Sequence, residues 1–253
     1  MSIAIVGAEF ELRLNGQSVF NNKAINVHAG DILSFEQPPL DRKAPEKSRI
    51  SARAYLAFSA DLTASPLLNS FATNLTANFG GFKGRALKAG DLLELKNVRV
   101  APLKVLASQY HLHYHGNYLL RCTDSVESEW FEANEWQQFF SQSYQISSES
   151  NRMGLRLRGE PLQMLPKPQV VSSGLTSGSI QIPESGEPII SAVDGQTIGG
   201  YPRLANVISA DHNLLGQLKT GDKLNFVYVS RKEAIEQLMQ KAALLQRVKR
   251  SLL

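Results

Sequence analysis

Apolar and polar residues alternate over short stretches along most of the chain, as they do in half-buried β-strands. Gly, Pro, Asn and Asp separate these stretches at close, irregular intervals. Apolar residues recur at helical spacing, three and four positions apart, in two stretches, residues 130–144 and 231–252. The sequence therefore predicts a mainly β protein with a few helices.

A Gly-Asp pair between apolar segments occurs three times, within residues 24–35, 86–95 and 217–226. Glycine permits a tight corner, and aspartate can bond the backbone amides that follow it. Each copy therefore predicts a strand, a turn and a second strand. Frequent corners of this kind favour a barrel or a folded sheet, and their uneven spacing excludes a solenoid.

Two helix starts are predicted from their capping residues. Asn134 and Gln137 fit an N-cap pair in the first helix, and Ser230 with Glu233 forms a capping box that opens the last one. We expect the last helix to pack through its apolar positions, Ile235, Leu238 and Met239 above all. The full set at helical spacing is Ile235, Leu238, Met239, Ala242, Leu245, Val248 and Leu252.

These patterns divide the chain into three parts. Residues 1–107 form an N-terminal β-rich half, residues 108–232 a C-terminal β-barrel half with one helix, and residues 233–253 an amphipathic helix. The proline at position 102 opens the joint between the halves. Residues 110–114 and 118–122 are predicted to pair as a hairpin directly after it.

Composition excludes several classes of protein. The single cysteine of the 253 residues rules out an internal disulfide and a cysteine-based metal cage. A net charge of +4 without a basic stripe argues against nucleic-acid binding. No apolar run reaches the roughly 18 residues of a membrane span, and the start lacks the features of a secretory signal. We expect a cytoplasmic protein that does not bind a membrane.

Residues 178–211 carry the strongest candidate site. Asp194, Gln196 and Thr197 share one corner, directly before Gly199, Gly200 and Tyr201. A carboxylate accepts N–H bonds and a primary amide both donates and accepts, so together they suit the N–C=O edge of urea, a lactam or the biotin ureido ring. The alternative is that Asp194 and Thr197 cap a turn and the glycines bend a strand.

Arginines and glycines supply two candidate anion sites. Arg152 and Arg156 lie four apart on a predicted strand and so face one side, where guanidinium groups suit a carboxylate or phosphate. Surface pairing with glutamates is the alternative. Gly80, Gly81 and Arg85 lie in a glycine-rich loop that could wrap an anion with backbone amides, although its spacing is not that of a Walker A loop. There the alternative is a barrel corner.

Alternating histidines and the lone cysteine complete the candidates. His111, His113 and His115 share one strand face, but no carboxylate stands at third-ligand spacing, so we predict a solvent face and no metal. Cys122 lacks the flanking residues of a nucleophile, and we predict that it is buried.

Three motifs together resemble a known family. They are residues 79–87 (FGGFKGRAL) with Ala89-Gly90-Asp91 after them, residues 151–157 (NRMGLRL), and the stretch 178–211. In this order they are similar to the biotin-dependent carboxyltransferase family, which includes the allophanate hydrolase subunit 2 type domain of urea carboxylase and the C subunit of 5-oxoprolinase. The resemblance implies a cyclophilin-like β-barrel architecture with two β-rich halves.

The resemblance also implies a function. The chain is expected to be part of a 5-oxoprolinase-type complex, which opens 5-oxoproline to glutamate with ATP, or a related carboxyltransferase acting on a small amide. The B subunit of 5-oxoprolinase (allophanate hydrolase subunit 1 type) and its A subunit are the implied partners. ATP would enter through the complex, and biotin only from another protein, because no methionine adjoins a lysine as in a biotinyl site.

With the resemblance, roles can be given to the candidates. Asp194, Arg152 and Gln196 are the predicted catalytic residues. The predicted substrate-binding residues are Arg156, Thr197, Gly199, Gly200, Tyr201, Gly80, Gly81 and Arg85.

The sequence departs from the family at two places, and these keep other functions open. The family's Q-D-x-G-R and S-G-A-M-D segments, expected before the first residue, are absent, and residues 122–128 read CTDSVES in place of a G-P-Q-like loop. One alternative is a non-catalytic regulatory binding protein within the complex, an antagonist of a histidine-kinase inhibitor. Another is a misplaced start codon with the full enzyme encoded upstream. Enzymatic activity is thus left open by the sequence.

Overall fold

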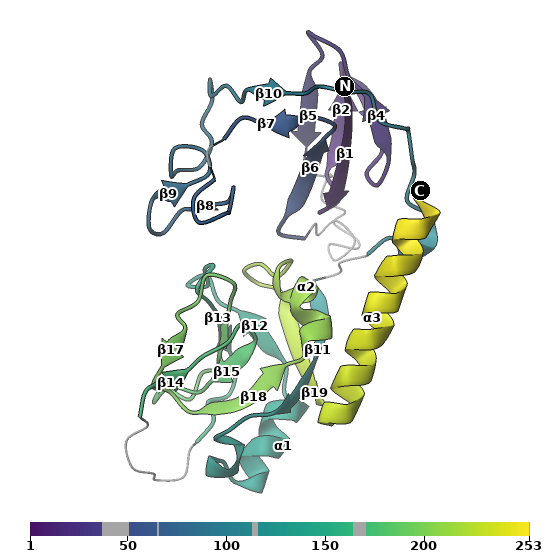
Figure 1. Ribbon diagram of the computed structural model, residues 1–253. Coiled ribbons are helices and arrows are strands. Elements are labelled where there is room, and N and C mark those ends of the chain that lie inside the picture. The colour runs from purple at the N-terminus through teal and green to yellow at the C-terminus, as the bar shows by residue number, and fades with distance from the viewer. Residues whose placement is uncertain (37–50, 65, 113–115, 164–170, 253) are drawn as a thin grey trace. The chain divides into compact units, whose positions relative to one another are not determined.

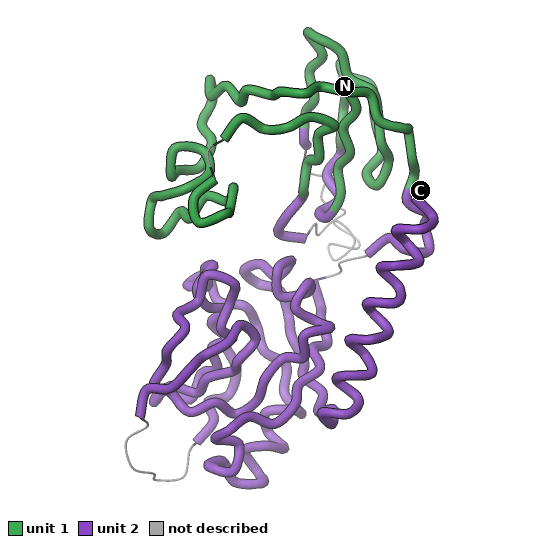
Figure 2. Tube along the Cα trace, viewed as in Figure 1, with its two compact units in different colours: residues 1–6, 12–34, 55–105 green, residues 7–11, 35–54, 106–253 purple. Residues whose placement is uncertain are grey.

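The computed structural model describes residues 1–36, 51–64, 66–112, 116–163 and 171–252. The chain divides into two compact units (Figure 2). The first comprises residues 1–6, 12–34 and 55–105, and the second residues 7–11, 35–54 and 106–253. The described residues are mainly β with three α-helices and a closed barrel, which confirms the predicted fold class.

The first unit is built from small sheets (Figure 1). Two have three strands, in the orders β4-β1-β6 and β3-β2-β5, and two have two strands, β10-β7 and β8-β9. The strands are β1 (Ser2–Gly7), β2 (Glu11–Leu14), β3 (Gln17–Val19), β4 (Ala24–Asn26), β5 (Leu33–Glu36), β6 (Ala54–Phe58), β7 (Asp61–Leu62), β8 (Thr73–Asn74), β9 (Phe79–Gly80) and β10 (Leu95–Lys96).

The second unit holds a closed barrel in the order β11-β18-β15-β16-β13-β12-β19. β19 runs parallel to β11 and closes the ring, and the other neighbours are antiparallel. Closure gives each of these described strands a neighbour on both sides. The strands are β11 (Asn117–Asp124), β12 (Tyr144–Ile146), β13 (Gly154–Arg158), β15 (Ser179–Gln181), β16 (Ile189–Ser191), β18 (Arg203–Val207) and β19 (Lys223–Tyr228).

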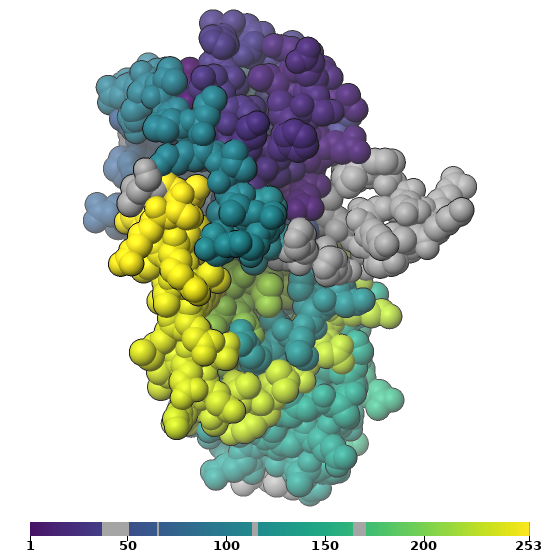
Figure 3. Space-filling view, turned by 90° about the vertical axis from the view of Figure 1, so that its right-hand side faces the viewer, coloured from purple at the N-terminus to yellow at the C-terminus, as the bar shows by residue number. Residues whose placement is uncertain are grey.

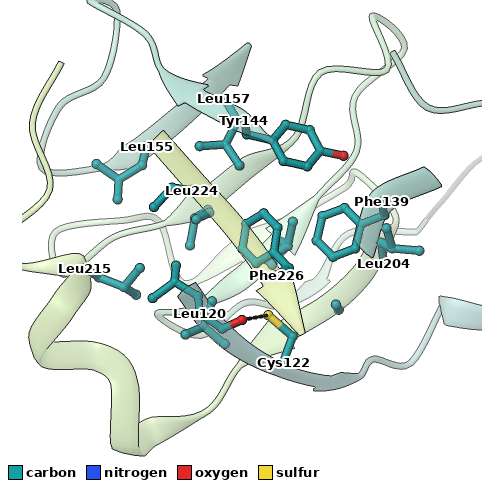
Figure 4. Close-up of a cluster of buried hydrophobic side chains, with 14 of the residues drawn as sticks. Leu120, Cys122, Phe139, Tyr144, Leu155, Leu157, Leu204, Leu215, Leu224 and Phe226 are labelled. Carbon is teal, nitrogen blue, oxygen red and sulfur yellow. Dashed lines mark hydrogen bonds between the residues drawn. The ribbon is translucent and has the colours of Figure 1, made fainter. Parts of the chain in front are cut away.

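Alternating side chains of these strands fill the barrel (Figure 4). In β11 every second residue from Tyr118 to Cys122 is buried, as the predicted strand pattern requires. Helix α1 (Ala133–Ser141) covers the cluster with Phe139, whose ring stacks on Phe226 at 4.6 Å between centroids. The hydrophobic core of this unit is therefore made by strand periodicity and one helix face.

The start of α1 differs from the prediction. Its N-cap is Glu132, so Asn134 lies inside the first turn, and the predicted pair of Asn134 with Gln137 is wrong. The reason is tertiary: Phe131 is buried in the core in extended backbone, and a 3-10 helix, η3 (Ser128–Trp130), occupies the residues before it. Burial of Phe131 thus fixes where the helix begins.

The predicted hairpin around position 116 is also wrong in the described part. Tyr110 ends a 3-10 helix, η2 (Ser108–Tyr110), and His111 and Leu112 follow it outside any strand. The described partners of β11 are β19, along residues 117–122, and β18, along residues 122–124. His113 and His115 lie outside the described residues, while His111 bonds the Leu106 carbonyl oxygen at 3.0 Å.

Each Gly-Asp corner closes with the same pair of hydrogen bonds. The aspartate N–H donates to the carbonyl oxygen three residues earlier, and the aspartate carboxylate accepts from the N–H of that earlier residue. The glycines take φ of about +90, +85 and +84°, where a side chain would be strained. The carboxylate therefore bonds the amide before the corner, not those after it. The pairs are His28–Asp31, Lys88–Asp91 and Lys219–Asp222.

Helix α3 (Arg231–Ser251) begins with the predicted capping box of Ser230 and Glu233, which is confirmed. Its packing is not as expected. Ile235, Leu238 and Met239 are 59, 45 and 67% exposed, so the prediction that they pack on the protein is wrong. Figure 3 shows this helix, in yellow, at the surface.

Polar contacts hold α3 against the barrel unit instead. Lys241 Nζ donates to the Ala210 carbonyl oxygen at 2.6 Å, and Arg121 donates to the Gln237 side chain. Ala210 belongs to η4 (Ser209–Asp211), which leads into the short helix α2 (His212–Leu215). Ile235 and Leu238 line a cavity of about 610 Å³ together with residues of β11 and β18, so they border the barrel without being buried against it.

Candidate functional site

A cavity of about 260 Å³ opens beside three neighbouring strands of the barrel, β15, β16 and β13. Its lining also includes the loop before β13 and the segment between β16 and β18. Polar and apolar side chains contribute together, as in sites that fix a small ligand. The lining residues are Asn151, Met153, Gly154, Arg156, Leu175, Gln181, Ile189, Ser191, Gln196 and Tyr201.

Two of the three predicted catalytic residues, Arg152 and Asp194, meet in space. The guanidinium donates to both carboxylate oxygens, from Nε at 2.5 Å and from Nη2 at 3.0 Å. The Asp194 N–H also donates to the Arg152 carbonyl oxygen at 2.9 Å. Neither side chain lines the cavity. The pair joins the two loops that carry Met153 and Gln196 to the cavity.

Among the predicted residues, Gln196, Tyr201 and Arg156 line the cavity itself. Arg156 forms no ion pair with the described residues, and it also lines a polar recess of about 160 Å³ next to the cavity. Its neighbour Arg158 lies 3.9 Å from Glu149. Arg156 therefore brings to this cavity a cation that can bind an anion.

The remaining residues of the predicted corner form a small ribbon. β14 (Ser173–Gly174) pairs with β17 (Ile198–Gly199), and the Thr197 carbonyl oxygen accepts a bond from the Leu175 N–H at 2.8 Å. Thr197 and Gly200 are exposed and do not line the cavity. Gly199 lies against the cavity residue Gln181, because a Cβ built on it would come within 2.7 Å of the Gln181 side chain.

Gln181 is the cavity residue that sequence reasoning missed. It is 5% exposed, and its Nε2 atom has no hydrogen-bond partner in the described structure. The signal was present in the sequence, because a glutamine stands between Ile180 and Ile182 in an otherwise apolar run. A polar side chain at such a position is buried and needs a partner.

The glycine-rich loop of the first unit bonds mainly to itself. The N–H groups of Gly84 and Arg85 donate to carbonyl oxygens within the loop, and that of Phe82 donates to Thr73 Oγ1 at 3.0 Å. Gly81 has φ +48°, and a Cβ there would lie 2.1 Å from the same Thr73 oxygen. Close packing of the loop against Thr73 therefore explains why position 81 is a glycine.

Arg85, in the same loop, is neutralised by Asp91. Both guanidinium Nη atoms donate to the carboxylate at 2.7 Å, and this hydrogen bonding holds the pKa of Asp91 far below its usual range. The binding of an anion by Gly80, Gly81 and Arg85 stays a prediction. The internal bonds of the loop count against a nucleotide phosphate there.

Comparison with known proteins connects this geometry to a family. Residues 1–228 match the family model described as carboxyltransferase domain, subdomain A and B. The chain belongs to this carboxyltransferase domain family. The resemblance found in the sequence motifs is thereby confirmed.

Individual relatives of this carboxyltransferase domain are components or parts of larger enzymes. The chain is 32% identical to the C subunit of 5-oxoprolinase from Haemophilus influenzae over 234 residues, covering 92% of this chain and 71% of that protein. It is 33% identical to the C subunit of 5-oxoprolinase from Escherichia coli over 233 residues, with the same coverage. The crystal structure of Kluyveromyces lactis urea carboxylase superposes with a TM-score of 0.85 at 25% identity, over 100% of this chain and 23% of that one.

The described part of the carboxyltransferase domain holds neither a cluster of metal ligands nor a helix that could span a membrane. No three His, Cys, Asp or Glu side chains described there gather closely enough to hold a metal ion. Cys122 is fully buried, as predicted, and burial raises the pKa of its thiol (Figure 4). No helix in the described ranges has both the length and the apolar content needed to cross a membrane.

A mostly buried ion pair anchors the ribbon beside the cavity. Arg203 Nη2 and Glu127 Oε1 lie 2.5 Å apart, with side chains 13 and 10% exposed, and Arg203 also donates to the Gly174 carbonyl oxygen. Replacing Glu127 with glutamine is expected to lower the free energy of unfolding by about 3 kcal/mol at neutral pH, because Arg203 loses its counter-charge. Urea denaturation of the wild type and of Glu127→Gln would measure this difference in the free energy of unfolding.

The same pair predicts how stability depends on pH. The Arg203 hydrogen bonds lower the pKa of Glu127 in the folded state. The stabilisation is therefore complete above the unfolded-state pKa of about 4.3 and is lost as the pH falls through the folded-state value. The difference in stability between the wild type and Glu127→Gln should shrink in acid. A difference that stays constant down to the acid limit would show that charge is not its cause.

Proposed function

We propose that this carboxyltransferase domain binds 5-oxoproline in a 5-oxoprolinase-type complex, for its ATP-dependent opening to glutamate. One observation carries the proposal: the guanidinium of Arg156, unpaired among the described residues, and the primary amide of Gln196 line one small cavity. 5-Oxoproline carries a carboxylate, which suits a guanidinium, and a lactam N–C=O edge, which suits a primary amide.

The size of the cavity supports a small substrate. Its volume of about 260 Å³ lies below the roughly 300–1,000 Å³ of sites for drug-sized ligands. Tyr201, which is 48% exposed, supplies a ring and a hydroxyl at the wall. The Arg152–Asp194 pair would act by holding the cavity loops in place, not by touching the substrate.

A related carboxyltransferase reaction on another small amide would use the same groups. The ureido ring of biotin, supplied by another protein, presents the same N–C=O edge, so the donor set of the cavity fits it. ATP would supply the free energy for ring opening. The internal bonds of the glycine-rich loop count against its binding the ATP phosphates, because the Gly84 and Arg85 amides bond carbonyl oxygens of the loop and the Arg85 side chain is paired with Asp91.

The apolar side of α3 supports partners within a complex. Ile235, Leu238 and Met239 are exposed on one helix, and large exposed apolar groups that lie together mark protein contacts. We assign this side to a companion protein of the 5-oxoprolinase B type. The same surface would serve the second candidate function, a non-catalytic regulatory role, and it is the observation that favours that alternative.

The test is glutamate release from 5-oxoproline with ATP, using this chain together with the A and B components of 5-oxoprolinase. The proposed function predicts turnover that requires all three proteins. A stable three-component complex without turnover would favour the regulatory role. The double variant Leu238→Asp with Met239→Asp should prevent assembly without lowering the stability of the isolated chain, because both side chains are exposed.

A further inference from the structure

The amide of Gln181 is buried without a hydrogen-bond partner in the described structure. The side chain is 5% exposed, lines the cavity, and leaves Nε2 unbonded among the described residues. An unsatisfied buried amide costs stability, because its bonds to water are lost and not replaced. A position that keeps such a group next to a cavity is suited to a ligand that supplies the missing partner.

The strand is shaped to place this side chain. β15 and β18 pair as Ile180 with Ala205, and then Gln181 with Arg203, so the register shifts at Gln181. A bulge of this kind re-aims a side chain and is frequent beside binding sites. All three residues of β15 are buried, which departs from the alternation seen in β11.

Gly199 leaves room for the amide. A Cβ built there would lie 2.7 Å from Gln181 Nε2 and 3.2 Å from a Leu175 methyl carbon. The amide is therefore covered on that side by backbone only. A side chain at position 199 would push Gln181 out of its place.

We propose that Gln181 binds the carbonyl oxygen of the substrate's N–C=O group and so selects lactams and ureas over ring compounds that lack a carbonyl. This inference deepens the proposed function and rests on it for the identity of the substrate. Gln181 and Gln196 bring two primary amides to one cavity, and Arg156 brings a cation. Together they match a small cyclic amide that carries a carboxylate.

The chain offers a matched control in Gln217, which is 6% exposed. Its Oε1 accepts from the Arg53 N–H at 2.9 Å, and its Nε2 donates to the Arg53 carbonyl oxygen at 3.1 Å. Replacing a hydrogen-bonded glutamine with methionine leaves its backbone partners without a hydrogen bond. Replacing a glutamine whose amide is unbonded removes a polar group that has no partner. The two substitutions should therefore have opposite effects on stability.

The experiment compares Gln181→Met with Gln217→Met in the full chain. Gln181→Met should keep or raise the melting temperature, raise the dissociation constant for 5-oxoproline about tenfold, and reduce the preference for 5-oxoproline over proline by the same factor. Gln217→Met should lower the melting temperature and leave that preference unchanged. Gly199→Ala should weaken 5-oxoproline binding as Gln181→Met does.

Three results would overturn the inference: an unchanged preference in Gln181→Met, a loss of stability equal to that of Gln217→Met, or unaltered binding in Gly199→Ala. Failure of the proposed function is distinguishable. If the assembled wild type does not turn over 5-oxoproline, the role of Gln181 is tested separately, by measuring the binding of urea and 2-imidazolidinone to the chain. If the wild type binds these compounds and Gln181→Met does not, the proposed role of Gln181 is supported. If the wild type binds neither compound, that role is refuted.

Discussion

Replacing Arg156 with glutamine is expected to lower kcat/KM of the assembled complex for 5-oxoproline about 100-fold. Arg156 lines the cavity and has no ion pair among the described residues, so a bound carboxylate would be its counter-charge. A hydrogen bond to a charged group contributes about 1.5–3 kcal/mol, and each 1.4 kcal/mol is a factor of ten. Steady-state kinetics over a range of 5-oxoproline concentrations would measure the effect.

Arg158→Gln is the matched control. Arg158 lies two residues further along β13, is exposed, and stands 3.9 Å from Glu149 without lining the cavity. Its replacement should change kcat/KM less than twofold, because an exposed pair contributes only about 0–1 kcal/mol. Equal losses in both variants would indicate a general charge effect, and full activity in Arg156→Gln would remove this residue from the site.

Replacing Phe139 with alanine is expected to lower the free energy of unfolding of the barrel unit by about 4 kcal/mol. The ring is fully buried, stacks on Phe226, and lies 5.7 Å from the Tyr144 ring between centroids. Its removal leaves a cavity that a closed barrel cannot readily fill. Chemical denaturation monitored by tryptophan fluorescence and circular dichroism would measure the loss.

Phe140→Ala tests whether burial is the cause. Phe140 is the next residue of α1 and is half-buried, with its ring stacked on Trp136 at 5.4 Å. Because less of its surface leaves water on folding, its replacement should cost clearly less than that of Phe139. A larger loss for Phe140→Ala would place the stability of this unit in the outer aromatic cluster instead.

Local chemistry explains why some elements could be predicted. The capping box of α3 uses two residues three positions apart, so Ser230 and Glu233 determine that helix start by themselves. The alternation of β11 likewise gives its buried face from the sequence. The three motifs were sufficient for the family, and the resemblance to that family implied the cyclophilin-like barrel.

Packing between distant segments decided what the sequence could not. Arg152 pairs with Asp194 across 42 positions, and this pairing, not its motif, separates Arg152 from Arg156, which is unpaired among the described residues. The exposure of Ile235 and Leu238 likewise depends on tertiary structure, because both border a cavity between α3 and the barrel instead of packing against it.

The sequence by itself determined the alternation of β11, the capped start of α3, the positions of the Gly-Asp turns and the family, because each depends on residues within a few positions of the chain. Only the tertiary structure decided which polar groups are satisfied. Gln181 and Gln217 are both buried glutamines. Within the described part of the chain, Nε2 of Gln181 has no hydrogen bond, whereas Gln217 bonds the backbone of Arg53 through both Oε1 and Nε2. A hydrogen bond depends on two partners at a defined distance, and a one-dimensional pattern specifies only one of them.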